Sequence, residues 1–331
     1  MTHVTPFIVR LLLVSALLIP GLKTAPAQSM TILRDQAKTR VQAPSPVQRK
    51  QIRTLGRYGT IEPVKQRVHS SRSISAPFRS QAISAKSIIV MDAVTGKTLF
   101  SRAPDTPRQP ASTIKVLTGI IAIDMLRNTQ RVSVSQKAAR QPRSKVYLDP
   151  RKTYLANDLI NAVLLASAND ASVALAEKIA GSEKSFAIMM TRQARKLGAS
   201  NTICKTASGL TATGQKTTAR DLATIFRLAM KNGEFAARMN KTKIHTADGT
   251  LLRNHNKALW QIDGALAGKT GYTNAARQTY VGKFKRGADE IIIAIMGSET
   301  MWTDIKKLVS YGFSAKDRTA ALSLQDTENN S

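Results

Sequence analysis

The sequence predicts an α/β (α+β) fold in which helices flank an antiparallel sheet and a helical subdomain is inserted between its strands. Short apolar runs near residue 90 and again after residue 263 are typical of strands. The stretch between them repeats its apolar residues at the helical spacing of three and four. The 331 residues, 42% of them hydrophobic, are sufficient for a buried core. Only one apolar run approaches membrane length, which excludes a polytopic membrane protein.

The first 27 residues have the features of an export signal. Arg10 precedes an apolar run over residues 11–20 that is too short to cross a membrane as a helix, and Ala25 and Ala27 supply small residues for cleavage. We expect a signal peptide over residues 1–27 and a location in the periplasm or cell envelope; an uncleaved anchor is the alternative. The single cysteine, Cys204, excludes an intrachain disulfide and a cysteine-based zinc site.

Residues 28–82 form a strongly basic segment without a persistent apolar pattern. They carry eleven Lys/Arg against two acids, a net charge of +9, in a chain whose formal net charge is +29. This composition predicts a mostly disordered arm that binds an anionic wall or membrane surface, with a partnerless solvated linker as the alternative. The export signal argues against nucleic acid as a partner, and one tyrosine and one phenylalanine give the arm no stacking platform.

The folded part is expected over residues 83–315 and begins with a hairpin. Residues 87–93 and 97–103 are strand-like, and Thr95-Gly96 between them suits a tight turn. After a proline-rich turn region, Ser112 begins a periodic segment through Leu126, and serine is a favourable cap for such a helix.

More helices, then strands, complete this part. Helical spacing marks four stretches, at residues 157–166, 170–179, 183–197 and 219–231. Three closing strands are expected at residues 265–272, 278–285 and 290–296, and the short loops that join them favour antiparallel pairing. A final amphipathic helix is expected over about residues 303–313, followed by a polar tail over residues 316–331.

Ser112 and Lys115 form an S-x-x-K pair at the start of a predicted helix. Residues three apart share one helix face, so the amine can reach the hydroxyl. A serine hydroxyl needs a base to become a nucleophile, and a lysine can serve only when desolvation or a cationic neighbour keeps it neutral. Alone, the pair also fits a capping serine beside a surface lysine.

Two further polar motifs follow at long separation. Ser167-Ala168-Asn169 lies between two helical stretches, where it could enter a cleft or simply cap a turn. Lys269-Thr270-Gly271 lies late in a strand, where a cation and a hydroxyl can hold a carboxylate, or where a bulge can end the strand. Together and in this order, the three motifs match the S-x-x-K, S-D-N and K-T-G set of β-lactamases and penicillin-binding proteins, with S-A-N in the middle.

At these residues the chain resembles the serine-type D-alanyl-D-alanine carboxypeptidase family, the low-molecular-weight penicillin-binding proteins, as a short single-domain member. Supporting segments lie at residues 110–115, 207–210, 218–221 and 268–273. The resemblance implies the β-lactamase/DD-peptidase-like fold and a substrate, peptidoglycan stem peptides ending in D-Ala-D-Ala. It also implies that β-lactam antibiotics inhibit covalently, and that no metal, cofactor or histidine is required.

The resemblance assigns the catalytic roles. Ser112 would be the nucleophile that forms an acyl-enzyme, Lys115 its base, and Ser167 a proton relay towards the leaving amine. The backbone N–H groups of Ser112 and Tyr272 would form the oxyanion hole.

It assigns the substrate-binding roles as well. Asn169 would bind the substrate amide. Lys269 would attract the terminal carboxylate and keep the base neutral, and Thr270 would donate a hydrogen bond to that carboxylate. Gly271 and Tyr272 complete the substrate-binding strand.

Departures from the family pattern leave alternatives open. Family members often carry a second β-domain and a C-terminal amphipathic anchor, for which about 60 residues after Lys269 leave no room, so the arm is expected to replace the anchor. Residues 298–305 contain no arginine, which carboxypeptidases tend to place there for the terminal carboxylate, so a D,D-endopeptidase acting on cross-links is the alternative. A serine β-lactamase is less favoured because no E-x-x-L-N element is visible, and the intact motifs disfavour a non-catalytic wall-binding protein.

Overall fold

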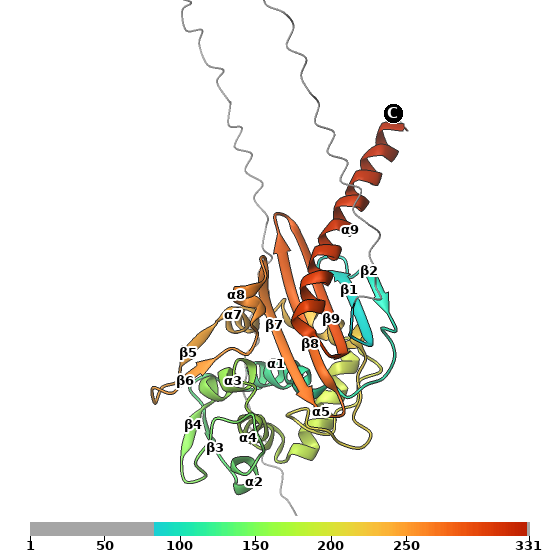
Figure 1. The fold of residues 1–331 in the computed structure, drawn as a ribbon. Coiled ribbons are helices and arrows are strands. Elements are labelled where there is room, and N and C mark those ends of the chain that lie inside the picture. The colour runs from blue at the N-terminus through green and yellow to red at the C-terminus, as the bar shows by residue number, and fades with distance from the viewer. Residues whose placement is uncertain (1–82, 330–331) are drawn as a thin grey trace, which may run out of the picture. The chain divides into compact units, whose positions relative to one another are not determined.

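The computed structural model describes residues 83–329, with side chains through residue 319, and its centre is a five-stranded antiparallel sheet. The strand order is β2-β1-β9-β8-β7. Figure 1 shows the helical block against one face of this sheet and the last helix along the other. The fold class expected from the sequence is therefore confirmed. The strands are β1 (Ser87–Asp92), β2 (Thr98–Arg102), β7 (Ala265–Thr273), β8 (Arg277–Arg286) and β9 (Asp289–Ser298).

Everything between β2 and β7 belongs to the inserted helical block, apart from two small ladders. The three-residue strands β3 and β4 pair antiparallel, and so do β5 and β6. The elements are η2 (Ala111–Ile114), α1 (Lys115–Met125), β3 (Arg131–Ser133), α2 (Gln136–Ala139), β4 (Thr153–Leu155), α3 (Ala156–Leu164), α4 (Asn169–Ala180), α5 (Glu183–Lys196), α6 (Ala219–Ala229), α7 (Gly233–Asn240), β5 (Lys243–His245), β6 (Leu251–Arg253) and α8 (Ala258–Gln261).

The central strands are apolar on both faces because both faces are covered. In β1, Ile89 and Met91 join the core under the helical block, whereas Ile88 and Val90 join the core under α9 (Met301–Asn329). β9 divides its residues in the same way. Side chains of a strand alternate between its faces, so one continuous apolar run supplies two cores.

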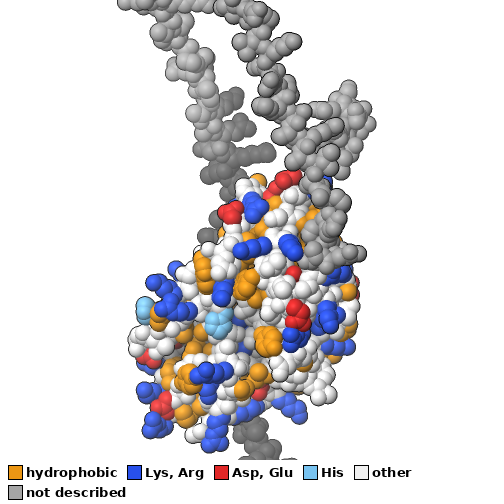
Figure 2. All heavy atoms as spheres, viewed as in Figure 1, with side chains coloured by type: hydrophobic (Ala, Val, Ile, Leu, Met, Phe, Trp, Pro, Cys, Tyr) orange, Lys and Arg blue, Asp and Glu red, His pale blue; other side chains and the backbone are white. Residues whose placement is uncertain are grey.

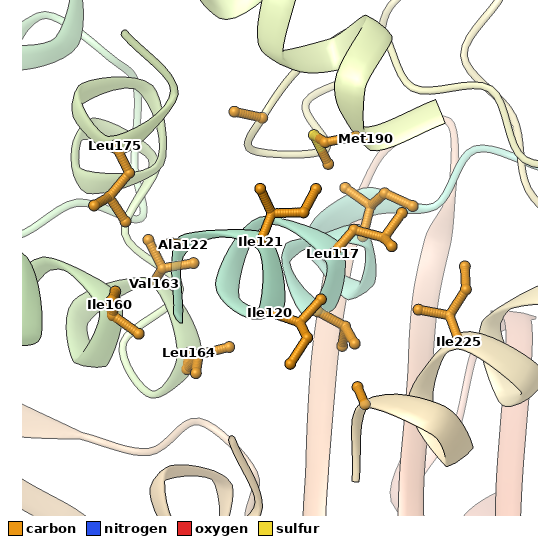
Figure 3. Packing of buried hydrophobic residues seen from close by; sticks show 14 of the residues in the cluster. Leu117, Ile120, Ile121, Ala122, Ile160, Val163, Leu164, Leu175, Met190 and Ile225 are labelled. Carbon is orange, nitrogen blue, oxygen red and sulfur yellow. The ribbon is translucent and has the colours of Figure 1, made fainter. Parts of the chain in front are cut away.

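Helix α1 lies at the centre of the larger core. Leu117, Ile120 and Ile121 point outwards from it towards the surrounding helices, as Figure 3 shows, and Met190 of α5 and Ile225 of α6 lie on its far sides. A helix that is apolar around its circumference must be buried, and this burial fixes where the S-x-x-K segment lies.

The start of helix α1 and the end of helix α9 differ from the positions expected from the sequence. Ser112 does not cap α1: the cap residue is Ile114, no side-chain capping bond forms, and the serine lies in the preceding 3₁₀ turn. Helix α9 continues to Asn329 instead of ending near residue 313. Lys316 forms ion pairs with Asp92 (2.5 Å) and Asp289 (2.9 Å), so the packed part extends into the segment expected to be a tail.

The expected signal peptide (1–27) and basic arm (28–82) lie outside the described residues. Within the described part, none of the helices combines the length and the apolar character needed to cross a bilayer. On the face drawn in Figure 2, Lys and Arg side chains are scattered among hydrophobic and uncharged ones, with fewer Asp and Glu between them.

Candidate active site

Ser112 lies in a short 3₁₀ turn that packs against the central sheet. Its neighbour Ala111 adopts a positive φ of 49°, an uncommon conformation for a residue with a side chain. Thr113 Oγ1 and Thr279 Oγ1 of β8 both donate to the Pro110 carbonyl, at 2.5 and 3.0 Å. These bonds join the turn to the sheet, so the strained backbone that presents Ser112 is fixed by surrounding structure.

Lys115 is fully buried, and its amine has three partners. Nζ lies 3.0 Å from Ser112 Oγ, 2.7 Å from Asn169 Oδ1 and 2.6 Å from the Ser208 carbonyl. The amide and carbonyl oxygens only accept. A neutral amine has two hydrogens and one lone pair, so donating to both oxygens leaves the lone pair for the serine hydroxyl.

The environment favours that neutral form. Burial is the main cause that lowers the pKa of Lys115 well below its ordinary value, and the positive charge of Lys269 lowers it further, against an opposing effect of Asp170. The contact between Ser112 and Lys115, and the lowered pKa of Lys115, are the features that a serine nucleophile and its base require.

A second buried lysine lies on the strand side of the site. Lys269 of β7 is 1% exposed; its Nζ donates to Ser167 Oγ at 2.9 Å and to the Thr270 carbonyl at 3.0 Å. Burial lowers the pKa of Lys269 to about 7. Ser167, between α3 and α4, has a φ of 59° and is 4% exposed, so an irregular turn directs its hydroxyl to this amine.

Asn169 connects the S-A-N turn to both neighbouring segments. It is the first residue of α4, and Ala168 is the cap residue, so the alternative interpretation of Asn169 as a cap is not observed. Its Oδ1 contacts Lys115, and its Nδ2 donates to the Pro142 carbonyl at 2.9 Å. Nδ2 forms no second hydrogen bond among the described residues, so its other hydrogen is available to a ligand in the cleft.

An open cleft of about 470 Å³ lies over these groups. The two lysines, Lys115 and Lys269, lie buried beneath it. Six further residues expected from the sequence line it: Ser112, Ser167, Asn169, Thr270, Gly271 and Tyr272. The structure thus brings all eight expected residues together from three distant stretches of the chain. Their individual roles stay predictions.

Gly271 allows the serine turn to contact β7. A Cβ at this position would lie 2.7 Å from the Ser112 backbone nitrogen and 2.6 Å from Thr279 Oγ1. Real Cβ atoms do not approach so closely, so only glycine lets the Ser112 N–H lie beside the strand that carries the Tyr272 N–H.

Several cleft residues were not expected from the sequence. Arg143, His255, Gln278, Met301 and Trp302 also line the cleft. Arg143 and His255 lie in loops, Gln278 lies at the start of β8, and Met301 and Trp302 begin α9, so their positions depend on the tertiary fold and no local motif marks them. Ser208 is different, because its segment, residues 207–210, was already noted as resembling the family.

His255 and Cys204 occupy contrasting environments. Desolvation first, and then the charges of Lys269 and Lys115, lower the pKa of His255 to about 4, so the ring is neutral at pH 7. Cys204 is buried, which raises the pKa of its thiol to about 12 and leaves it unreactive. Among the described residues, no group of three or more His, Cys, Asp or Glu side chains could hold a metal ion.

A cleft serine in contact with a buried lysine, a second buried lysine on strand β7 and an inserted helical block define a penicillin-recognising serine hydrolase. Comparison with known proteins gives the family. The model described as D-alanyl-D-alanine carboxypeptidase (Peptidase S11) matches residues 71–300, and the chain belongs to this family.

Individual relatives agree. D-alanyl-D-alanine carboxypeptidase DacB2 of Mycobacterium tuberculosis is 36% identical over 251 residues, which cover 72% of this chain and 86% of the relative. DacC of Escherichia coli is 30% identical over 262 residues, and the chain spans only 64% of its length. The structure of penicillin-binding protein D2 of Listeria monocytogenes in its cefotaxime-bound form superposes with a TM-score of 0.64 at 27% identity, covering 70% of this chain and 98% of that one.

Proposed function

We propose that the chain is a penicillin-sensitive serine D-alanyl-D-alanine carboxypeptidase that removes the terminal D-alanine from peptidoglycan stem peptides. The observation that carries the proposal is the contact of 3.0 Å between Ser112 Oγ and the amine of Lys115, whose pKa burial lowers, at the base of an open cleft. Membership of the carboxypeptidase family supports the choice of substrate.

Acylation begins when Lys115 accepts the Ser112 proton. Oγ attacks the carbonyl carbon of the penultimate D-alanine, and the developing oxyanion accepts hydrogen bonds from the N–H groups of Ser112 and Tyr272. One such donor typically contributes ~2.7–4 kcal/mol to lowering the barrier. The amide C–N bond breaks, and Ser167 passes a proton to the leaving amine. Water then hydrolyses the ester and restores the serine.

Substrate orientation depends on the strand side of the site. Charged Lys269 and the Thr270 hydroxyl hold the terminal carboxylate, while the free amide hydrogen of Asn169 binds a substrate carbonyl. The same charge on Lys269 helps to keep Lys115 neutral. One group thus binds the substrate and prepares the base.

The proposal is tested by labelling with fluorescent penicillin and by mass spectrometry of purified muropeptides. We expect a persistent adduct on Ser112, loss of one alanine from pentapeptides, and no label or release in Ser112→Ala. Ser101→Ala, on exposed β2, is the matched control and should behave as wild type. D-Ala release that survives Ser112→Ala would falsify the mechanism, and rapid release of the penicilloyl group would indicate a β-lactamase.

We further propose export through residues 1–27 and attachment of the basic arm, residues 28–82, to an anionic wall or membrane surface. The composition of both segments supports this proposal. The domain between residues 83 and about 316 would then act on peptidoglycan close to its site of attachment.

D,D-endopeptidase cleavage of cross-links is the second candidate function. The wall of the cleft near residues 298–305 is formed by Met301 and Trp302, and the nearby Arg277 is paired with Glu299 at 2.6 Å. This wall presents no free guanidinium to a terminal carboxylate, which weakens the preference for a free C-terminus.

A further inference from the structure

A second surface pocket adjoins the cleft. It measures about 480 Å³ and lies between the β5–β6 hairpin and α8, and we call it the β5–β6 pocket. His255 lines both this pocket and the cleft, so the two hollows share a wall residue. A ligand that extends past His255 from the cleft enters the β5–β6 pocket.

The pocket is basic, and two of its positive charges lie so close together that they repel each other when no anion is bound. Lys243 and Arg253 are register partners in the hairpin, so their side chains leave the same face directly opposite each other. Like charges in this position destabilise a hairpin. Lys257 adds a third cation, and no acidic residue of the described part lines the pocket.

None of these three cations forms an ion pair within the residues that the structure describes. An anionic ligand would relieve the repulsion between Lys243 and Arg253, and carboxylates are suitable partners for an arginine and lysines. The charge pattern therefore indicates an anion in this pocket.

Trp260 of α8 forms the remaining wall and is 55% exposed. Its ring offers a large apolar area together with a polar N–H group, a combination that is enriched at binding interfaces. Next to three cations, it suits a ligand that is partly apolar and carries carboxylate groups, such as an acidic peptide.

The position of His255 determines which end of a substrate would reach the pocket, and this step rests on the proposed function. Lys269 and Thr270 hold the terminal carboxylate of the leaving D-alanine. The backbone N–H of His255 donates to the Leu165 carbonyl at 3.1 Å, two residues before Ser167, whose hydroxyl accepts a hydrogen bond from Lys269. The β5–β6 pocket therefore lies beyond the leaving group.

A stem peptide that ends in D-Ala-D-Ala stops before this pocket. In a cross-linked peptide the leaving amine belongs to a second stem, which continues further and carries carboxylates of its own. We propose that the β5–β6 pocket binds this carboxylate-bearing leaving strand, and so is the subsite that the D,D-endopeptidase reaction uses.

The chemistry is the same as for D-alanine release. An ester bond forms between Ser112 Oγ and the D-alanyl carbonyl carbon, the amide C–N bond of the cross-link breaks, and the serine proton is transferred to the leaving amine. One water molecule then hydrolyses the ester, which frees the serine and the D-alanyl carboxylate.

The test compares two substrates, a monomeric pentapeptide and a cross-linked muropeptide dimer. Arg253→Gln/Lys257→Gln and, separately, Trp260→Ala should lower kcat/KM for dimers about tenfold, mainly through KM, and leave D-Ala release from monomers within about twofold. Lys306→Gln on α9, an exposed cation away from the pocket, is the matched control and should change neither. Thermal unfolding identifies any variant that does not fold.

Salt dependence gives a measurement on the wild-type protein alone. Dimer cleavage should fall more steeply with salt than D-Ala release, because screening weakens the contacts of exposed cations. Wild-type protein that releases D-Ala but leaves dimers intact overturns this inference and leaves the proposed function standing. Equal losses on both substrates also overturn it. A protein with no penicillin label and no D-Ala release overturns the proposed function itself.

Discussion

At the scale of single residues, two buried lysines with different partners divide the work of the site. Lys115 contacts two acceptor oxygens and one hydroxyl, which suits a neutral amine, whereas Lys269 keeps a pKa of about 7 and is charged in much of the population at neutral pH. Two groups of one type in different environments can act as a base and as a cation at the same pH. The pair titrates as a coupled system, so the pH profile of the enzyme reports both.

The pH dependence of kcat/KM should be bell-shaped. Activity rises with pH as Lys115 loses its proton, since only the neutral amine is a base, and falls as pH rises through about 7, where Lys269 loses the charge that binds the carboxylate. In Lys269→Arg the cation persists, so the alkaline limb should move above pH 9 although overall activity drops. Steady-state D-Ala release between pH 5 and 10 measures this. An unchanged alkaline limb in the variant means that Lys269 does not cause it.

Gly271→Ala should reduce kcat by about 100-fold without unfolding the protein. The new Cβ would lie 2.7 Å from the Ser112 nitrogen, so the serine turn must move away from β7 and one oxyanion donor is displaced. Gly233→Ala is the control, because a Cβ there meets no atom within 4 Å, and it should keep wild-type activity. D-Ala release and thermal unfolding distinguish the two effects. Full activity in Gly271→Ala would show that this close approach is not needed.

At the scale of elements, the sequence predicts the long strands and helices, because each repeats its apolar residues over many positions. It misses the short elements, which form only in the context of the tertiary fold. The strands β1, β2, β7, β8 and β9 and the helices α3 to α6 lie within a few residues of the expected ranges. The three-residue strands β3 to β6 are too short for a period of two to register, and α7 and α8 follow no long apolar stripe. His255 and Arg143 were missed as cleft residues because they lie in loops, where no periodic sequence pattern indicates which part of the fold a side chain contacts.

The junction between β9 and α9 depends on one carboxylate. Asp304 is fully buried and accepts hydrogen bonds from the backbone N–H groups of Ser84 (3.0 Å) and Ala85 (2.9 Å) and from the hydroxyl of Ser298 (2.7 Å). It connects the beginning of the described chain, the end of β9 and the start of α9. The N–H groups of Ser84 and Ala85 form no other hydrogen bond among the described residues.

Asp304→Ala should lower the free energy of unfolding by about 3 kcal/mol, since buried donors left without partners cost roughly 1–3 kcal/mol each. For a domain of this size the melting temperature should fall by roughly 6–12 °C. Asp105→Ala is the control: its ion pair with Arg220 is exposed, so we expect a loss of less than about 1 kcal/mol. Equal losses in the two variants would contradict the assigned role of Asp304. Thermal and urea unfolding provide the measurement.

At the scale of the whole molecule, charge is distributed unevenly between the basic arm and the folded part. Of the formal net charge of +29, residues 1–27 carry +2 and residues 28–82 carry +9, so residues 83–331 keep +18. The folded part is therefore basic on its own, as Figure 2 illustrates for one face. The arm adds a dense, linear set of charges, and binding through such charges depends strongly on salt.

The boundary at residue 82 can be tested by truncation, because the first described residues already belong to the core. Ile83 is 3% exposed, and Ser84 and Ala85 donate to Asp304. A chain of residues 83–331 should keep its melting temperature within about 2 °C and its D-Ala release within about twofold. A chain of residues 86–331 removes both backbone donors and the buried isoleucine, so it should lose at least the roughly 6–12 °C expected for Asp304→Ala.

The same 83–331 chain tests the role of the arm. Binding to purified wall sacculi at low salt should weaken about tenfold or more relative to residues 28–331, with some binding left because the folded part keeps its +18 charge. Raising the salt concentration should remove most of the difference between the two chains, since salt screens the attraction between the arm's cations and an anionic surface. Equal binding of the two chains at low salt would mean that the arm is a linker, and that the charge of the folded part alone attracts the enzyme to its substrate.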